Sequence, residues 1–326
     1  MTTQANASRE LWGIDIGGTK VVVAIGDAAG SVQYSDRFPA DRDEPPEVTL
    51  DRALGLLAQR STEPAGPSGI GVSCPGPFDR SGKRFCDTPN MPRWQSFEIG
   101  AYMAQAHPAP CTFMNDANAA ALAEHRWGAG KGTSSMLFLT MSTGLGAGLI
   151  LDGRAYQGPR GFAGEVGRIQ LADDGPIGFG AAGTAEGFLS GPGIEQQAQA
   201  EALACAQRGE PTALLDACAP LTCERVCALA EAGDAAALRV TNRVASRLGQ
   251  LVGLMANVLE PQLVVLGTIG EAHPGLFIPE ATEHMERCCV RETLRGLKIV
   301  PGGLGSHRPA LAALSIAMAT TMDEPC

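Results

Sequence analysis

The chain is poor in aromatic residues and in basic charge. Phenylalanine, tyrosine and tryptophan make up 5% of its 326 residues, whereas glycine occurs 41 times. This combination is typical of an α/β enzyme with many tight turns and argues against a repetitive or fibrous protein. The formal net charge of −10 argues against nucleic acid as the main partner, because a polyanion needs a basic face.

Signals for export, membrane insertion and metal binding are also missing. The first ten residues, MTTQANASRE, hold neither the basic nor the apolar segment of a secretory signal, so we expect a cytoplasmic protein. The most apolar stretch, residues 248–266, is interrupted by Asn257 and Glu260, which predicts a buried helix and a strand and no membrane partner. The ten cysteines contain no Cys-x-x-Cys pair, and reduced thiols are expected in that compartment.

Residues 11–27, LWGIDIGGTKVVVAIGD, read as two apolar strands joined by a tight turn. Two glycines in the turn tolerate positive φ and let backbone N–H groups approach an anion, and the next two residues add a hydroxyl and a cation. Asp15 suits a hydrated Mg²⁺, which binds few protein carboxylates. An ordinary Gly-Gly hairpin explains the same residues, and the Walker pattern is absent. The candidate phosphate-binding residues are Gly17, Gly18, Thr19 and Lys20.

Residues 135–151, SMLFLTMSTGLGAGLIL, repeat that pattern about half a chain later. Two Gly/Thr loops facing each other across a cleft could hold a polyphosphate from both sides. The pair therefore favours a phosphate-binding function more than either loop does alone. The candidate residues of the second loop are Ser142, Thr143, Gly144 and Gly146.

The apolar pattern predicts two α/β domains joined at a hinge close to residue 116. Residues 1–116 with 310–326 are expected to form the smaller domain and residues 117–309 the larger one. Strands are expected at 11–16, 21–26, 31–38, 69–73, 108–114 and 264–267. Helices are expected at 47–60, from 116 onward, within 194–259 and at 310–321, with an irregular glycine-rich stretch at 158–193.

Asp116 is the leading candidate for a general base. It lies where a predicted strand meets an alanine-rich helix, and Asn115 beside it can orient a hydroxyl. Aspartate is also a common helix cap, and the local sequence leaves that interpretation open. The position between the two phosphate-loop candidates favours catalysis, because phosphoryl transfer needs little beyond aligned groups and charge neutralisation.

Three further polar residues occupy glycine- or proline-rich turns. Glu165 and Glu186 could accept hydrogen bonds from vicinal hydroxyls of a sugar-like ligand, although their chemistry alone favours ordinary solvated loop acids. Asn90, in TPNMP, is either a turn residue or a reader of hydroxyls.

Taken together, these segments resemble the ROK family (repressor, open reading frame, kinase) over nearly the whole chain. The resemblance rests on five runs: DIGGTK at 15–20, GVSCPG at 71–76, NDANAA at 115–120, STGLG at 142–146 and GEVG at 164–167. It implies duplicated α/β domains of the actin-like (ribonuclease H-like) fold with a cleft between them. It also implies an ATP- and Mg²⁺-dependent sugar kinase that forms a homodimer.

The resemblance assigns a role to each candidate residue. Asp116 would take the proton from the sugar hydroxyl, both Gly/Thr loops would hold the phosphates of ATP, and Gly267 would lie near the adenosine. The residues implied to contact the sugar are Gly76, Asn90, Asn115, Glu165 and Glu186.

The chain departs from the family pattern at a zinc site. Members have histidine where this chain has Arg168, and their zinc-binding run Cys-x-Cys-Gly-x-x-Gly-Cys appears here as IGFGAAGT at 177–184. Ile177, Phe179 and Thr184 replace the thiolates, so we expect no structural zinc and expect the two apolar residues to pack the loop.

Arg168 also bears on the substrate, because a guanidinium cannot accept a hydrogen bond as neutral imidazole can. It is expected to pair with Glu165 or Glu186, or to meet a differently placed oxygen. The acceptor would then be a hexose, an aminosugar such as kanosamine, or a valiolone-type cyclitol, the last two belonging to antibiotic biosynthesis.

The sequence therefore predicts an ATP-dependent kinase that phosphorylates the primary hydroxyl of such an acceptor. A ROK repressor would need a winged helix-turn-helix before the first strand, and ten residues precede Leu11. A catalytically inactive sugar-binding sensor or regulator is the other alternative, and the retention of Asp15, Asp116 and both loops argues against it.

Overall fold

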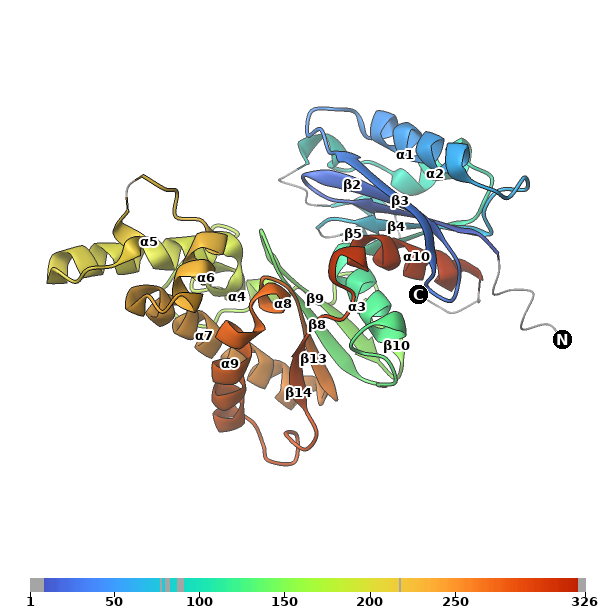
Figure 1. Ribbon diagram of the computed structural model, residues 1–326. Coiled ribbons are helices and arrows are strands. Elements are labelled where there is room, and N and C mark those ends of the chain that lie inside the picture. The colour runs from blue at the N-terminus through green and yellow to red at the C-terminus, as the bar shows by residue number, and fades with distance from the viewer. Residues whose placement is uncertain (1–8, 77, 80–82, 87–90, 217, 322–326) are drawn as a thin grey trace. The chain divides into compact units, whose positions relative to one another are not determined.

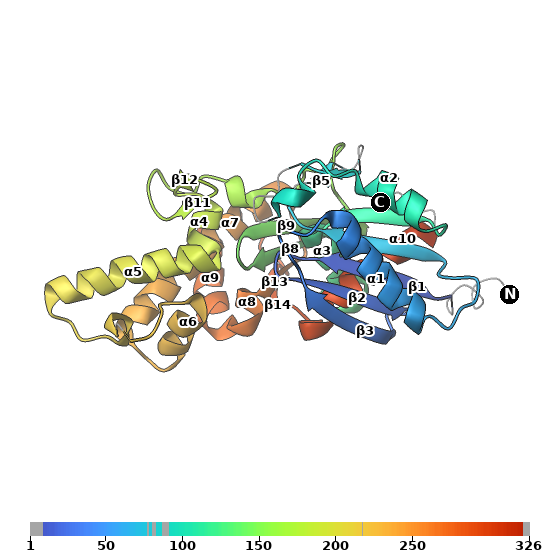
Figure 2. The same ribbon diagram turned by 90° about the horizontal axis from the view of Figure 1, so that it is seen from above.

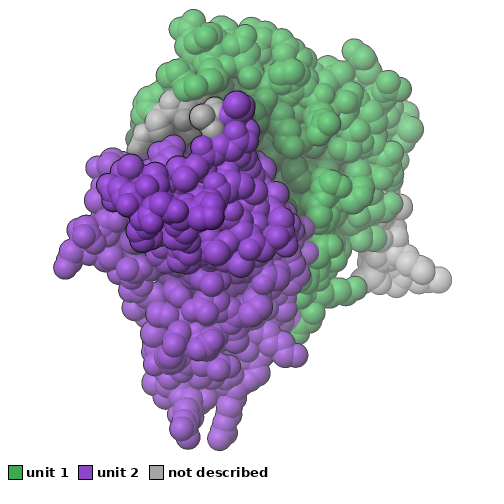
Figure 3. All heavy atoms as spheres, turned by 60° about the vertical axis from the view of Figure 1, so that its left-hand side comes forward, with its two compact units in different colours: residues 1–132, 148–164, 303–326 green, residues 133–147, 165–302 purple. Residues whose placement is uncertain are grey.

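The computed structural model describes residues 9–76, 78–79, 83–86, 91–216 and 218–321. The chain divides into two compact units, coloured separately in Figure 3. Unit 1 comprises residues 1–132, 148–164 and 303–326, and unit 2 comprises residues 133–147 and 165–302. This division differs from the expected one because the helix that follows residue 115 packs against the last helix of the chain and so belongs to unit 1.

Unit 1 is built on a five-stranded mixed sheet of order β3-β2-β1-β4-β7. The first three strands form an antiparallel meander, whereas β1, β4 and β7 run parallel. The strands are β1 (Leu11–Ile16), β2 (Lys20–Gly26), β3 (Val32–Pro39), β4 (Gly69–Cys74) and β7 (Cys111–Asn115), with a short hairpin of β5 (Phe78–Asp79) and β6 (Arg84–Phe85).

Helices cover both faces of this sheet (Figures 1 and 2). α1 (Pro46–Arg60) and α2 (Ile99–Ala106) lie over one face, and α10 (Arg308–Thr321) lies against β1, β2 and β4 on the other. α3 (Asp116–Trp127) packs on α10. The strands approach α10 closely because they carry glycine there: a Cβ on Gly13 would stand 2.8 Å from that of Ala313.

The buried carboxylate of Glu124 fastens α3 to the segment before α10. Its oxygens accept hydrogen bonds from the backbone N–H groups of Ala129 (2.9 Å), Gly303 (3.0 Å) and Leu304 (3.3 Å). The side chain is fully buried, and Arg308 lies 3.9 Å away. Because unpaired buried N–H groups are costly, this single side chain keeps the returning C-terminal segment in register with α3.

The second sheet has the order β10-β9-β8-β13-β14. Strands β8, β13 and β14 run parallel. Its strands are β8 (Met136–Met141), β9 (Leu145–Leu151), β10 (Arg154–Ala155), β13 (Leu263–Thr268) and β14 (Lys298–Pro301). A small hairpin of β11 (Ile177–Gly178) and β12 (Ala181–Ala182) belongs to unit 2.

The helices of unit 2 gather around the long α7, which contacts α4, α5, α6 and α9. They are α4 (Ala185–Leu189), α5 (Gly191–Arg208), α6 (Cys223–Glu231), α7 (Ala235–Leu259), α8 (Ile269–Ala272) and α9 (Pro274–Cys288). Among the described residues, no helix has both the length and the apolar character needed to cross a bilayer.

The α/β class expected from the sequence is confirmed, and the expected strands and helices are present within a few residues. The stretch 158–193 is less irregular than expected, since it contains the β11–β12 hairpin, α4 and the start of α5. Thr184 and Ser190 begin these helices by accepting hydrogen bonds from the N–H groups of Gly187 and Gly193.

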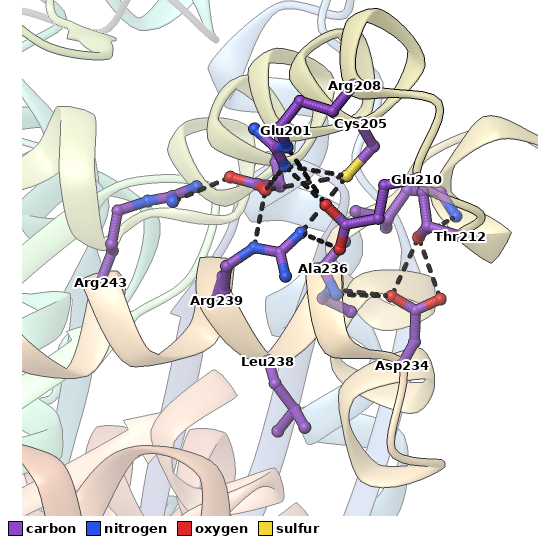
Figure 4. Close-up of polar contacts among 12 residues, drawn as sticks. Glu201, Cys205, Arg208, Glu210, Thr212, Asp234, Ala236, Leu238, Arg239 and Arg243 are labelled. Atoms are coloured by element: carbon purple, nitrogen blue, oxygen red, sulfur yellow. Dashed lines mark hydrogen bonds and ion pairs between the residues drawn. The ribbon is translucent and has the colours of Figure 1, made fainter.

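A cluster of charges joins α5 to α7 on unit 2 (Figure 4). Arg239 and Arg243 each donate to the carboxylate of Glu201 at 2.9 Å, and Arg208 donates at 3.2 Å. Glu201 is 7% exposed. Burial alone would raise its pKa, but these hydrogen bonds prevail and hold the pKa of Glu201 at about 2.

The low pKa of Glu201 predicts a pH-dependent contribution to stability. The contribution is complete above the unfolded-state pKa of 4.5 and is lost as the pH falls toward 2. We expect Glu201→Gln to lower the free energy of unfolding by about 1–3 kcal/mol at pH 7, because the arginines are partly exposed and the loss is smaller than for a buried pair. Urea titrations at several pH values measure the difference in free energy of unfolding between the variant and wild type. This difference should become smaller below pH 4.5.

Glu283→Gln is the matched control, since Glu283 pairs with Arg287 at 3.5 Å on an exposed helix surface. It should change the free energy of unfolding by less than about 0.5 kcal/mol. Equal effects of the two variants would contradict the assignment of Glu201 as the tie between α5 and α7.

Candidate active site

The carboxyl ends of three parallel strands gather polar groups at one edge of the unit 1 sheet. The register pairs Asp15 on β1 with Ser73 on β4, and Ser73 with Met114 on β7. Asp116 follows two residues after Met114, at the start of α3. Ligands of open α/β sheets bind at such an edge.

Asp116 is the first residue of α3, and the cap of that helix is Asn115. The Asn115 side-chain oxygen accepts from the N–H groups of Ala117 (3.0 Å) and Asn118 (3.4 Å). The carboxylate of Asp116 accepts one bond, from Ala117 at 2.8 Å. The sequence left a capping role for Asp116 open, and the structure gives that role to its neighbour.

Both carboxylates at this edge have raised pKa values. Burial raises the pKa of Asp15 to about 6, against the lowering effects of the nearby Ser73 hydroxyl and the charge of Lys20. Burial and, second, the charge of Asp15 raise the pKa of Asp116 to about 6. Asp116 is nevertheless exposed to solvent, so we give the repulsion between the two acids more weight than the loss of water. A carboxylate of this kind is a stronger base than an isolated one.

The turn between β1 and β2 is tight, as expected, but it uses no left-handed glycine. Gly17 donates its N–H to the carbonyl oxygen of Lys20 at 3.0 Å, and neither Gly17 nor Gly18 has positive φ. A Cβ on Gly17 would stand 2.9 Å from that oxygen, so glycine is needed here for room. Thr19 and Lys20 are exposed beside the turn.

Gly76 lies next to this edge, after β4. Its φ of 70° is in the left-handed region, and its carbonyl oxygen accepts a hydrogen bond of 2.8 Å from the Asn115 amide nitrogen. The Asn115 amide is thus engaged at both ends, which fixes its orientation.

In unit 2, the second Gly/Thr loop connects β8 to β9. Ser142 donates its N–H to the Gly144 carbonyl oxygen at 2.9 Å, and Thr143 between them is exposed. A Cβ on Gly144 would lie 2.8 Å from a carboxylate oxygen of Glu186. Gly146 lies within β9, and Gly267 pairs with Thr140 on β8.

The structure places the Glu186 carboxylate against this loop. Glu186 is 8% exposed and accepts a hydrogen bond of 3.1 Å from the Leu145 N–H and another from the N–H of Phe179. Burial raises its pKa, and these bonds with the charge of Arg168 partly offset the effect. The Glu186 carboxylate is therefore buried and fixed by hydrogen bonds, whereas its chemistry alone favoured a solvated loop acid.

Arg168 has a partner that the sequence did not suggest. Its guanidinium carbon stands 3.8 Å from the centre of the Phe179 ring. We expected Arg168 to pair with a glutamate and Phe179 to pack the loop; the structure brings the two residues onto each other, with Glu186 close enough to feel the charge. Glu165 is exposed, and Asn90 lies outside the described residues.

Two features at the strand ends were missed by sequence reasoning. Ser73 stands opposite Asp15, which follows only from the pairing of β1 with β4. Thr268 ends β13 with φ 54° and ψ −107°, a strained conformation for a β-branched residue, and its hydroxyl lies 3.2 Å from that of Thr140. A threonine in such a conformation leaves no signal in the sequence.

Among the described residues no group of three or more His, Cys, Asp and Glu side chains could hold a metal ion. In the loop that corresponds to the zinc-binding run of the family, Phe179 contacts Arg168 and the Thr184 hydroxyl caps α4. Ile177 is 57% exposed and Phe179 43%, so neither apolar residue is buried in the loop as expected.

Comparison with known proteins identifies relatives of two kinds. The glucokinase of Halalkalibacterium halodurans is 31% identical over 301 residues, and the match covers 90% of each chain. The xylose repressor of Bacillus subtilis is 26% identical over 317 residues, which cover 95% of this chain and 77% of the repressor. The ROK hexokinase of Thermus thermophilus is a solved structure with a TM-score of 0.78 and 29% identity, covering 97% of this chain and 100% of the hexokinase.

These similarities confirm the actin-like ATPase fold and the sugar-kinase resemblance expected from the sequence. The sequence profile of the ROK family matches residues 11–320, nearly the whole chain. The chain therefore belongs to the ROK family.

Proposed function

We propose that the protein is an ATP-dependent kinase that transfers a phosphoryl group to a hydroxyl of a sugar or a sugar-like cyclitol. The observation that carries the proposal is the pair of carboxylates, Asp15 and Asp116, at the carboxyl edge of the unit 1 sheet. A glucokinase and a hexokinase among the relatives support the reaction class.

In this proposal Asp116 is the general base. Its carboxylate takes the proton from the acceptor hydroxyl while that oxygen attacks the terminal phosphorus of ATP and the bond to the ADP oxygen breaks. Support comes from its exposure and from a pKa raised to about 6, which leaves the group ionised at neutral pH yet basic enough to accept a proton.

The donor set at this edge fits Mg²⁺. Asp15 supplies a carboxylate oxygen and Ser73 beside it a hydroxyl, and hard oxygen ligands are what this ion prefers. Bound through water to Asp15, the ion would neutralise phosphate charge. The N–H groups and side chains of the turn 17–20 would bind phosphates, as would the loop 142–146, and Gly267 would lie near the adenosine.

For the acceptor, we propose a hexose, an aminosugar or a cyclitol phosphorylated on its primary hydroxyl. Glu186 supports this, because a buried carboxylate held by two backbone N–H groups retains lone pairs for ligand hydroxyls. The other proposed sugar contacts are Gly76, Asn90, Asn115, Glu165 and Arg168. We further propose a cytoplasmic homodimer that uses no nucleic acid or membrane partner.

A sugar-binding regulator is the second candidate, favoured by the similarity to the xylose repressor. Such a protein would bind the sugar without turning it over. The two candidates therefore differ in one measurable property, the release of ADP.

Release of ADP in the presence of each acceptor tests the proposal. The panel consists of glucose, fructose, mannose, N-acetylmannosamine, kanosamine and a valiolone-type cyclitol, and we expect turnover with at least one. With that acceptor Asp116→Asn should lower kcat by about 10²–10⁴-fold, because the proton acceptor is lost. The wild-type kcat/KM should rise with pH through about 6.

Two controls separate catalysis from folding. The ionised form of a carboxylate with a raised pKa costs stability above that pKa, so Asp116→Asn should be no less stable than wild type at pH 7. Asp36→Asn, on the exposed strand β3, should keep wild-type turnover. An active Asp116→Asn protein would refute the general-base assignment, and sugar binding without any ADP release would favour the regulator.

We also propose that the protein folds without structural zinc. Metal analysis of protein purified without chelators should find much less than about one zinc ion per chain, and EDTA should leave the melting temperature unchanged. Roughly one zinc ion per chain that survives gel filtration would contradict this proposal.

A further inference from the structure

The tip of the β11–β12 hairpin carries a residue in an unfavourable conformation. Phe179 has a φ of 50°, a value that L residues with large side chains rarely adopt, and it is 43% exposed. Gly180 follows with a φ of 75°. Such a conformation persists only where its surroundings impose it, and two contacts hold Phe179 in place.

One contact is made by the ring. The guanidinium carbon of Arg168 lies 3.8 Å from the ring centre, nearer than in the other four such stacks within the described residues, which range from 4.7 to 5.5 Å. A cation over an aromatic face is attracted by the ring quadrupole, and a planar guanidinium also stacks on it.

The other contact is made by the backbone. The N–H of Phe179 donates to the carboxylate of Glu186, which also accepts from Leu145. Gly178, one residue earlier, lies so close to α4 that a Cβ there would overlap the N–H of Gly187. The hairpin tip therefore lies directly on the turn of helix that bears Glu186.

The base of the hairpin is fastened separately. The side-chain amide of Gln196 on α5 accepts from the Ile177 N–H at 2.9 Å and donates to the Ile177 carbonyl oxygen at 3.0 Å. These bonds hold the first strand but not the tip. The Thr184 hydroxyl also donates to the Gly178 carbonyl oxygen at 3.5 Å, and the contact with Arg168 is the one that holds the Phe179 ring at the tip.

We propose that Arg168 and Phe179 form a brace that holds the hairpin tip against Glu186 and so fixes the carboxylate that binds the acceptor. The effect of this brace on catalysis rests on the proposed function, in which Glu186 binds the sugar. Both are positioning residues in this role: they orient Glu186 and take no part in proton or phosphoryl transfer.

The brace predicts a selective kinetic effect. Without it, the Glu186 carboxylate loses one of two backbone donors and samples more orientations, so the acceptor binds more weakly while the turnover of bound acceptor is preserved. We expect Phe179→Leu to raise the KM for the acceptor about tenfold, with kcat and the KM for ATP changed by less than about twofold.

The first experiment measures amide hydrogen exchange of residues 178–182 in the full-length protein and needs no substrate. Phe179→Leu removes the aromatic face but keeps an apolar side chain at the same φ, and Arg168→Gln removes the charge. Each should accelerate exchange at the tip by about tenfold, and the double variant should exchange no faster than either single one. Phe179→Tyr, which keeps the ring, should exchange like wild type.

Arg52→Gln is the matched control, because Arg52 lies 5.2 Å from the centre of the Phe38 ring in unit 1. It should leave exchange of residues 178–182 unchanged. The second experiment measures acceptor and ATP kinetics of the two Phe179 variants, where Phe179→Tyr should restore the KM that Phe179→Leu raises.

The two experiments distinguish the brace from the proposed function. Faster exchange at the tip in the first two variants, with no turnover of any acceptor by wild type, would support the brace and refute the kinase. Turnover by wild type together with unchanged exchange in Phe179→Leu and Arg168→Gln would overturn the brace, as would additive effects in the double variant.

Discussion

The parallel pairing of β1, β4 and β7 is the constraint on which the unit 1 site depends. It sets Asp15, Ser73 and the start of α3 side by side at one edge of a sheet. Burial raises the pKa of both acids, and the charge of Asp15 raises that of Asp116 further. The proposed phosphate and its cation would relieve the repulsion between these acids.

The sequence predicted the separate strand ends at this edge but not which strands lie next to each other. The apolar runs of β1 and β7 and the abrupt change at Asn115 and Asp116 mark strand ends, because burial and helix capping are local properties that leave a local pattern. The neighbour of β1 is not local: β4 comes from a distant part of the chain, so the contact between Ser73 and Asp15 had no sequence signal. The same limit applies to the boundary at residue 116, since only the packing of α3 on α10 shows to which unit that helix belongs.

In unit 2 the sequence identified individual residues but not their partners. Arg168 and Phe179 both stood out as departures from a family pattern, yet their contact depends on the conformation of a hairpin tip. Thr268 did not stand out at all, because its left-handed backbone is imposed by the junction of β13 with α8 and not by a glycine. From its chemistry alone Glu186 was expected to be a solvated loop acid, whereas the structure shows a carboxylate that accepts hydrogen bonds from two backbone N–H groups. Phe179 and Thr268 both have positive φ, a backbone conformation that local propensity does not predict for residues other than glycine.

The placement of α10 has a consequence for synthesis on the ribosome. Unit 2 ends at residue 302, so all of its residues have been made before α10 emerges. Until then the faces of β1 and β2 that carry Leu11, Val22 and Ala24 lack the apolar partners that α10 supplies. The unit whose strands are translated first is therefore the last to be completed, and a nascent chain exposes an apolar sheet face that a chaperone can bind.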